Sequence, residues 1–167
     1  MSQENVFGTE GIKKLTALAE DIDFCMFCTA LAVHPIETSP MSVQEVDAHG
    51  DIWFLASKSS EKCQNIATDK MVQLMFAHPG DFKFLTVYGE ASLSADQSRI
   101  DKYWNKMVEG WFEKGREDPD ITLIQVKPQD MHYWDTKEHK MISFAKVLWS
   151  SVTGTKTDPG VEGDITI

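Results

Sequence analysis

Two serines and a lysine follow directly on an apolar stretch, and these residue types are suited to binding an anion. The stretch Asp51–Ser57 has the composition of a strand, and Ser59, Ser60 and Lys62 come next. Apolar residues then recur at helical spacing, so a helix is predicted to begin near Ser59 or Ser60. The free N–H groups and the dipole at such a helix start favour negative charge, and Lys62 adds a full positive charge.

The same residues are also what an ordinary capped helix with a solvated lysine would show, and the pattern alone leaves both interpretations open. Glu61 stands beside Lys62 and opposes its charge unless the glutamate points away. The whole chain carries a net charge of -10. Because an acidic chain is a poor general binder of nucleic acid or of anionic membranes, neither partner is expected, and a bound anion would have to be held by a local site.

The cysteines and histidines do not follow a pattern typical of a metal or redox site. Cys25 and Cys28 match C-x-x-C, but they lie in the run Phe24–Val33, which is predicted to be a strand buried on both faces. Residues three apart on a strand point to opposite faces, so the two sulfurs are expected to be separate buried thiols. The histidines show no ligand spacing, and no metal is expected.

The elements around the candidate anion site are predicted to form one mainly antiparallel sheet with flanking helices. Strands are expected at Phe24–Val33, Ser39–Asp47, Asp51–Ser57, Met71–His78, Phe84–Leu93, Ile121–Val126 and Asp130–Asp135. Gly89 in mid-strand predicts a bulge or a close backbone approach, and Lys127-Pro128 is expected to break the sheet. Thr9–Ile22 is predicted to be an amphipathic helix, and Asp96 is predicted to cap another. Short connections between neighbouring strands indicate a small barrel.

The length of 167 residues fits one domain, expected over residues 8–154. A strand is expected at Lys140–Phe144 and a closing helix at Ala145–Thr153, and the polar residues 155–167 are expected to be a mobile tail. No apolar run approaches the ~20 residues of a membrane-spanning helix. The first residues also lack the pattern of a signal peptide, so a cytoplasmic protein is expected.

A series of short motifs stands in a characteristic order and spacing along residues 12–154. The motifs are Pro40-Met41 followed by Gln44–Asp47, Trp53-Phe54, Ser60 with Lys62, Val87-Tyr88-Gly89, Trp104-Asn105, Trp111-Phe112, Asp118-Pro119-Asp120 and Tyr133-Trp134-Asp135. Together they resemble the FMN-binding split-barrel family related to pyridoxamine 5′-phosphate oxidase, and within it the general stress protein 26 group. The resemblance implies an antiparallel split β-barrel of six or seven strands.

The resemblance also implies a homodimer with two FMN sites at the subunit interface. The strand at residues 41–44 would run along the flavin ring, and residues 55–56 would lie near the ribityl chain. The remaining contacts would come from a phosphate-binding pair on the helix start and from an aromatic residue of the partner subunit that covers the cofactor. The implied cofactor-binding residues are Met41, Ser42, Val43, Gln44, Leu55, Ala56, Ser60, Lys62 and Trp134. From the residues alone, a partly buried aromatic in the barrel wall is the favoured interpretation of Trp134.

Two positions and one segment depart from the family pattern. Many relatives carry Arg where this chain has Ser39, and pyridoxamine phosphate oxidases carry Arg where it has Glu61. Residues 135–140 stand in place of that oxidase's arginine-rich substrate segment. True pyridoxamine phosphate oxidation is therefore not expected. Each lost charge-assisted bond would weaken FMN by about 1.5–3 kcal/mol, so weak binding is expected.

The function that the resemblance implies is an FMN-dependent oxidoreductase of unknown substrate, because the flavin supplies the redox chemistry and the protein positions it. No side chain is assigned as an acid, base or nucleophile. Two alternatives stay open: a non-catalytic FMN-binding stress or sensor module, and a cofactor-free dimeric interaction protein. Ser39 and Glu61 are the residues that favour the last of these.

Overall fold

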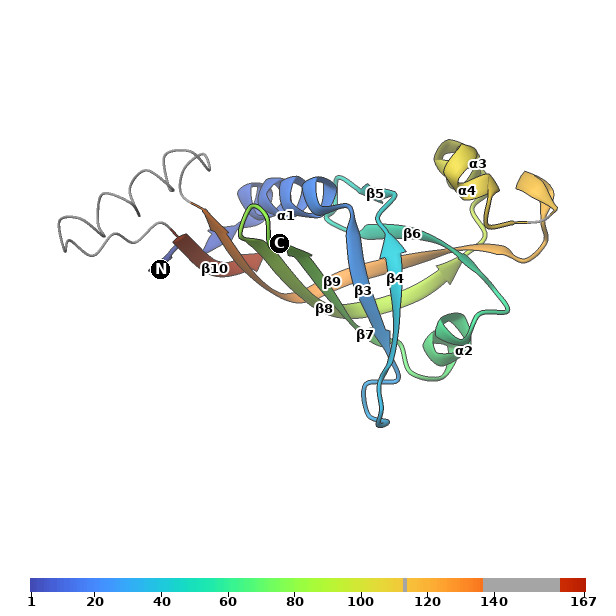
Figure 1. The fold of residues 1–167 in the computed structure, drawn as a ribbon, viewed down its shortest axis with the longest axis horizontal. Helices are drawn as coiled ribbons and strands as arrows, with labels where there is room; N and C mark the ends of the chain where they lie inside the picture. The colour runs from blue at the N-terminus through green and yellow to red at the C-terminus, as the bar shows by residue number, and fades with distance from the viewer. Residues whose placement is uncertain (113, 137–159) are drawn as a thin grey trace.

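A long, curved and open sheet forms the body of the molecule (Figure 1). The computed structural model describes residues 1–112, 114–136 and 160–167. The strands are β1 (Ser2–Gln3), β2 (Val6–Phe7), β3 (Phe24–Thr29), β4 (Glu37–Ser42), β5 (Glu45–Val46), β6 (Ile52–Ser57), β7 (Met71–His78), β8 (Lys83–Ser94), β9 (Ile121–Thr136) and β10 (Gly160–Thr166). The helices are α1 (Gly8–Ile22), α2 (Glu61–Thr68), α3 (Gln97–Tyr103), α4 (Lys106–Glu109) and the 3-10 turn η1 (Gly115–Glu117).

The strands follow the order β1-β10-β9-β8-β7-β3-β4, with β6 paired to β9 and β5 paired to β6. Only β1 and β2, which both pair with β10, run parallel to their partner among the described strands. The predicted mainly antiparallel β fold with flanking helices is confirmed. Over the described residues the sheet has 10 strands rather than six or seven, because two short N-terminal strands and the last strand also join it.

Helix α1 lies across one side of the sheet and closes the main core (Figure 1). Leu15, Leu18 and Ala19 on its inner face are buried. They pack into a cluster that includes Phe27 and Phe54, whose rings meet edge to face with centroids 5.2 Å apart. Burying each large side chain contributes about 1.5–3 kcal/mol, so the amphipathic pattern of α1 is a main source of stability.

Strand β3 is covered on one face over most of its length, so the prediction that both faces are buried is wrong. Phe24 and Met26 are 51% and 45% exposed, whereas Phe27, on the same strand between β4 and β7, is buried. The strand becomes covered on both faces only at its end, where Asn65 of α2 donates a hydrogen bond to Thr29 Oγ1 at 3.0 Å. Cys25 and Cys28 are free, buried thiols, as predicted.

The ladder between the long strands β8 and β9 contains a bulge. Their register shifts between Tyr88 and Gly89, as the mid-strand glycine predicts. A Cβ atom on Gly89 would lie 2.3 Å from the Lys127 carbonyl oxygen. Strand β9 runs on through Lys127-Pro128, so the predicted break there is wrong. Pro128 lies opposite Gly89, and its missing N–H is tolerated because a bulge already interrupts the ladder.

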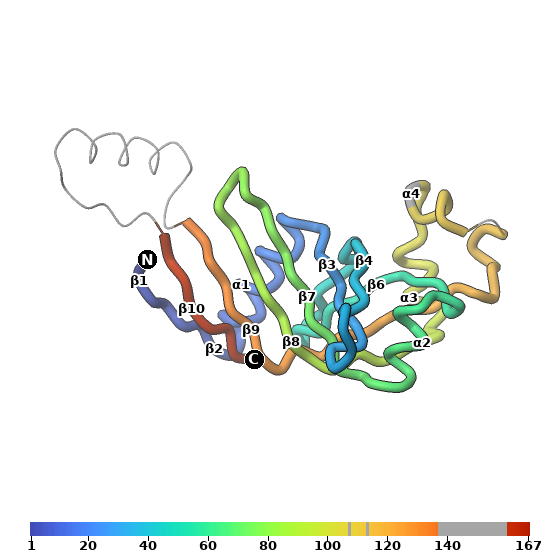
Figure 2. Tube along the Cα trace, turned by 60° about the horizontal axis from the view of Figure 1, so that its bottom comes forward, coloured from blue at the N-terminus to red at the C-terminus, as the bar shows by residue number. Residues whose placement is uncertain are grey.

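Strand β10 (Gly160–Thr166) is part of the sheet, which corrects the expectation of a mobile tail for these residues, whereas residues 155–159 of the expected tail lie outside the described residues. Strand β10 pairs with β9 along Gly160–Asp164 and carries β1 and β2 on its other side (Figure 2). Val161 and Ile165 alternate into the core. The Tyr133 hydroxyl also donates to the Glu4 carbonyl at 2.7 Å, so both ends of the chain are held. The elements predicted at Lys140–Phe144 and Ala145–Thr153 lie outside the described residues.

In the part of the chain that the structure describes, every helix is too short or too polar to cross a membrane.

Candidate functional site

Residues 57–60, which run from the last residue of β6 to the residue before α2, form a segment named the serine turn. Ser60 directly precedes α2 with an extended backbone, so the predicted helix start is confirmed. Its hydroxyl does not cap the helix and instead donates to the Ser57 carbonyl at 2.6 Å. The amide of Ser60 donates to the same carbonyl at 3.0 Å, which closes the turn.

Helix α2 offers free donors at its first turn. Its third and fourth amides donate to the Ser60 carbonyl, at 3.1 Å from Cys63 and 3.2 Å from Gln64. The amides of Glu61 and Lys62 have no partner among the described residues, as expected for the first positions of a helix. Lys62 is half-buried, and no described carboxylate lies within ion-pair distance of its ammonium group. These groups form a donor set suited to a phosphate.

A carboxylate from a distant part of the sequence already binds the serine turn. Asp120 accepts hydrogen bonds from both hydroxyls of Ser57 and Ser59, the latter at 2.8 Å, and from the Ser59 amide at 2.9 Å. The Ser57 and Ser59 hydroxyls, together with the Ser59 amide and the charge of Lys58, hold the pKa of Asp120 below its usual range. The serine turn therefore binds an anionic group of the chain itself, which shows that its donors suit an anion.

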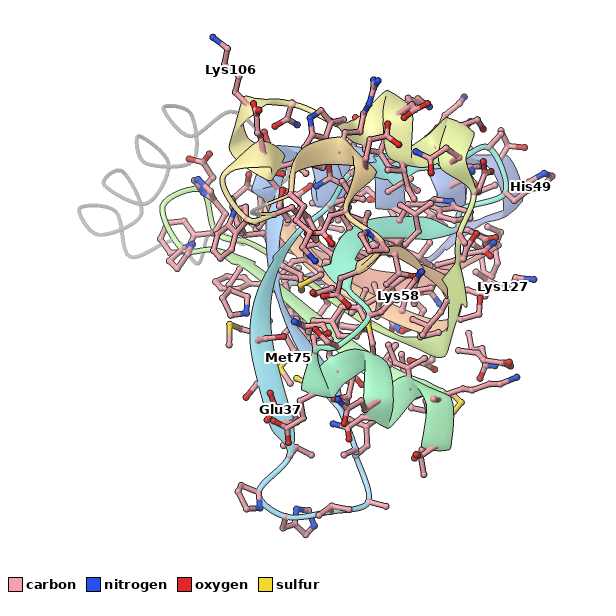
Figure 3. All side chains as sticks on the ribbon, turned by 90° about the vertical axis from the view of Figure 1, so that its right-hand side faces the viewer. Glu37, His49, Lys58, Met75, Lys106 and Lys127 are labelled. Carbon is pink, nitrogen blue, oxygen red and sulfur yellow. The ribbon has the colours of Figure 1, made fainter. Side chains whose placement is uncertain are left out.

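Backbone contacts hold Asp120 beside the turn. Ser57 pairs with Ile121 across the β6–β9 ladder. The Lys58 amide donates to the Asp120 carbonyl at 2.7 Å, and Lys58 Nζ donates to the Pro119 carbonyl at 3.0 Å. Figure 3 shows Lys58 on the segment that leads into α2. Asp120 is absent from the predicted site residues, because only the pairing of β6 with β9 brings it here. The motif Asp118-Pro119-Asp120 was the available signal, but it carried no role.

Strand β4 lies at the end of the sheet, so one edge of its backbone has no strand partner among the described residues. Met41 is buried in the main core. Its side chain therefore cannot lie along a ligand at the surface, although its backbone can. Ser42 donates to Asp23 at 3.1 Å, and the Gln44 side chain donates to the Ser42 carbonyl at 3.2 Å. Val43 packs against the core while remaining partly exposed.

Ser39 has a buried hydroxyl oxygen without a hydrogen-bond partner in the described part of the chain. A buried hydroxyl without a partner costs about 1–3 kcal/mol, so such a group often marks a place where a ligand or water completes the bonding. Ser39 lies on β4, two residues before Met41. The departure from the family pattern at this position thus leaves an unused polar group near the predicted ligand edge.

The other predicted cofactor residues lie at different distances from the serine turn. Leu55 and Ala56 precede it on β6, where Ala56 faces the main core and Leu55 packs against a second cluster. Trp134 is at the opposite end of β9 from Ile121, which at ~3.3 Å per residue is roughly 40 Å along the strand. Within one protomer, Trp134 therefore does not join the serine turn.

A charged network fixes the β5–β6 hairpin to α3. Arg99 Nη1 lies 3.1 Å from Glu45, and its guanidinium stacks over the Trp53 ring at 4.0 Å. The Tyr103 hydroxyl, followed by the charges of Lys102 and Arg99, lowers the pKa of Glu45 against the opposing effect of burial. Burial and the Glu45 carboxylate raise the pKa of Tyr103 to about 12. These residues hold structure together, although several belong to the motifs that carry the resemblance.

Within the described ranges, no group of His, Cys, Asp and Glu side chains is arranged to hold a metal ion.

Comparison with known proteins decides the family. A family model described as pyridoxamine 5′-phosphate oxidase like matches residues 10–158, which is most of the chain. The chain belongs to the pyridoxamine 5′-phosphate oxidase-like family. This confirms the resemblance inferred from the motifs.

Two solved structures and one curated protein are similar to this family member. A crystal structure described as general stress protein 26 from Jannaschia sp. CCS1 is 21% identical, with a TM-score of 0.81 over 96% of this chain and 100% of that one. A general stress FMN/FAD binding protein from Xanthomonas citri is 26% identical, with a TM-score of 0.64 over 77% of this chain and 89% of that one. Protein bli-3 of Neurospora crassa is 25% identical over 112 residues, 62% of this chain. That match spans only 54% of the fungal protein's length.

Proposed function

We propose that this pyridoxamine 5′-phosphate oxidase-like protein binds FMN, with the phosphate at the serine turn and the start of α2. The observation that carries the proposal is the donor set of this segment. It already binds one carboxylate through Ser57 and Ser59, while Lys62 and the first two amides of α2 lack partners among the described residues. An FMN phosphate carries close to two negative charges and several acceptor oxygens, which match these donors. The similarity to the general stress FMN/FAD binding protein of Xanthomonas citri supports the same ligand class.

The flavin ring is proposed to lie against the free edge of β4 near residues 41–44. Backbone N–H and C=O groups of an edge strand can read the polar edge of a flat ring. Ser39 lies on the same strand, and its unpartnered hydroxyl can bond to a ring or ribityl oxygen. Leu55 and Ala56 would contribute through backbone atoms and through the partly exposed side chain of Leu55.

We also propose a homodimer, as the family resemblance implies. Three large apolar side chains lie on one exposed sheet face, since Met26 pairs with Met75 across the ladder and Phe24 lies two residues along β3. Their exposed fractions are 45%, 42% and 51%. Contiguous exposed apolar surface of this kind marks interaction sites. A partner on this face would bury it and could bring Trp134 of the partner subunit to the flavin, which the length of β9 prevents within one protomer.

The proposed activity is that of an FMN-dependent oxidoreductase, not that of a true pyridoxamine phosphate oxidase. Bound FMN would supply the transfer of a hydride or electrons. The residues of this chain bind the phosphate, orient the ring and exclude water. A non-catalytic FMN-binding stress or sensor module would use the same contacts. The cofactor-free interaction protein is the second candidate, because Asp120 already occupies the serine donors and Glu61 adds another negative charge.

The experiment that tests the proposal is a titration of the purified protein with FMN, followed by quenching of flavin fluorescence. Riboflavin has the same ring without the phosphate, so it is the matched control ligand. Saturable FMN binding that is at least tenfold tighter than riboflavin binding is expected, since each charge-assisted bond contributes about 1.5–3 kcal/mol. Equal affinities would refute a phosphate site. An absence of binding at tens of micromolar would favour the cofactor-free candidate.

A further inference from the structure

We propose that Asp120 is an internal competitor for the phosphate site, which sets the affinity of the serine turn for phosphorylated ligands. The inference rests on the proposed function of this site. Asp120 would determine specificity, and it is neither one of the predicted cofactor-binding residues nor one of the positions that depart from the family pattern. The Asp120 carboxylate accepts hydrogen bonds from the Ser57 and Ser59 hydroxyls, so these donors are not available to a second anion.

The competition follows from the number of donors on the turn. Ser57 and Ser59 each have a single hydroxyl proton, and both protons point to Asp120. The Ser59 amide is also used by Asp120, and the Ser60 hydroxyl is used by the Ser57 carbonyl. In this state the donors of residues 57–62 that have no partner among the described residues are the ammonium of Lys62 and the first two amides of α2. The hydroxyls become available only when the carboxylate releases them.

Charge acts in the same direction as the donors. Asp120 makes no ion pair with any described cation, so its negative charge is compensated mainly by neutral donors. A phosphate at the start of α2 would lie next to this charge. Two unit charges about 4 Å apart in water repel each other by about 1 kcal/mol, which changes a binding constant about fivefold. Riboflavin has no phosphate, so neither the occupied serine donors nor the charge of Asp120 changes its affinity.

The backbone contacts allow Asp120 to be tested without dismantling the turn. The Lys58 amide bonds to the Asp120 carbonyl, and Lys58 Nζ bonds to the Pro119 carbonyl, so both survive a change of the side chain. Asp120→Asn keeps one acceptor oxygen for the Ser59 amide and removes the charge. Asp120→Ala is the second variant, and it releases all three donors.

The experiment compares FMN and riboflavin affinities for the wild-type chain, Asp120→Asn, Asp120→Ala and Glu61→Gln. Both Asp120 variants are expected to bind FMN about fivefold more tightly or better, with riboflavin affinity unchanged. Glu61→Gln removes an equal charge at the first position of α2 but releases no serine, so a smaller gain is expected. Thermal unfolding of each variant confirms that it is folded.

Each outcome decides the matter. If the Asp120 variants bind FMN and the wild-type chain does not, the competition is supported most directly. If the wild-type chain binds FMN and the Asp120 variants bind it with the same or lower affinity, this inference is overturned but the proposed function stands. An equal gain in Glu61→Gln would show that charge alone acts and would overturn the competition for serine donors. FMN binding no tighter than riboflavin binding in every variant would overturn the proposed function and this inference together.

Discussion

Replacing Lys62 by alanine is the most direct perturbation of the proposed phosphate site. Lys62 is half-buried and has no ion-pair partner among the described residues, so its removal leaves no acceptor of the protein unsatisfied. The loss in binding is therefore the loss of one charge-assisted contact with the phosphate. Such contacts contribute about 1.5–3 kcal/mol, which corresponds to roughly ten- to a hundredfold in the dissociation constant.

The assay is a titration of the protein with FMN and, separately, with riboflavin, followed by quenching of flavin fluorescence. Lys62→Ala is expected to bind FMN at least about tenfold more weakly and riboflavin as before. Lys70→Ala is the matched control, because Lys70 follows α2, is 65% exposed and pairs only loosely with Glu90 at 3.4 Å. The unfolding midpoint is expected to change little in either variant, since surface substitutions usually stay within about 0.5 kcal/mol.

Three results would refute this reasoning. An unchanged FMN dissociation constant in Lys62→Ala would remove Lys62 from the site. An equal loss of FMN and riboflavin affinity would show that Lys62 supports the ring or the local fold, not the phosphate. A loss of the same size in the Lys70 control would point to long-range charge and not to contact, and raising the salt concentration would then abolish it.

Three further predictions concern stability and assembly. Gly89→Ala would place a Cβ atom 2.3 Å from the Lys127 carbonyl oxygen, so a loss of about 1–3 kcal/mol is expected in chemical denaturation. Met26→Asp puts a charge on the exposed apolar face and is expected to give a folded monomer by light scattering; a dimer that survives would exclude this face. Tyr103→Phe removes the main cause of the lowered pKa of Glu45. The resulting deficit in unfolding free energy is expected to be full above the unfolded pKa of about 4.3 and to vanish as pH falls through the lower folded value. A deficit that is constant with pH would exclude the carboxylate.

The local pattern of the sequence determined most of the backbone. Strand β7 has the predicted bounds Met71–His78, and α1 differs from its prediction by one residue. The hairpin between β5 and β6 follows from Gly50, whose φ of 84° is accessible to glycine, and from Asp47, which accepts the His49 amide at 2.9 Å. All three features depend on neighbours in the sequence, and for the strand and the helix spacing and residue type were sufficient to predict them.

The tertiary structure alone decided which distant residues meet. Ser57 and Asp120 are 63 positions apart, and the register of β6 on β9 places them in contact. The same kind of pairing made the polar C-terminal stretch a strand, since β9 on one side and β1 and β2 on the other satisfy its backbone groups. The exposed face of β3 was also invisible in its apolar sequence. Composition shows that a side chain prefers to be buried, but only the arrangement of the other elements determines which face is covered.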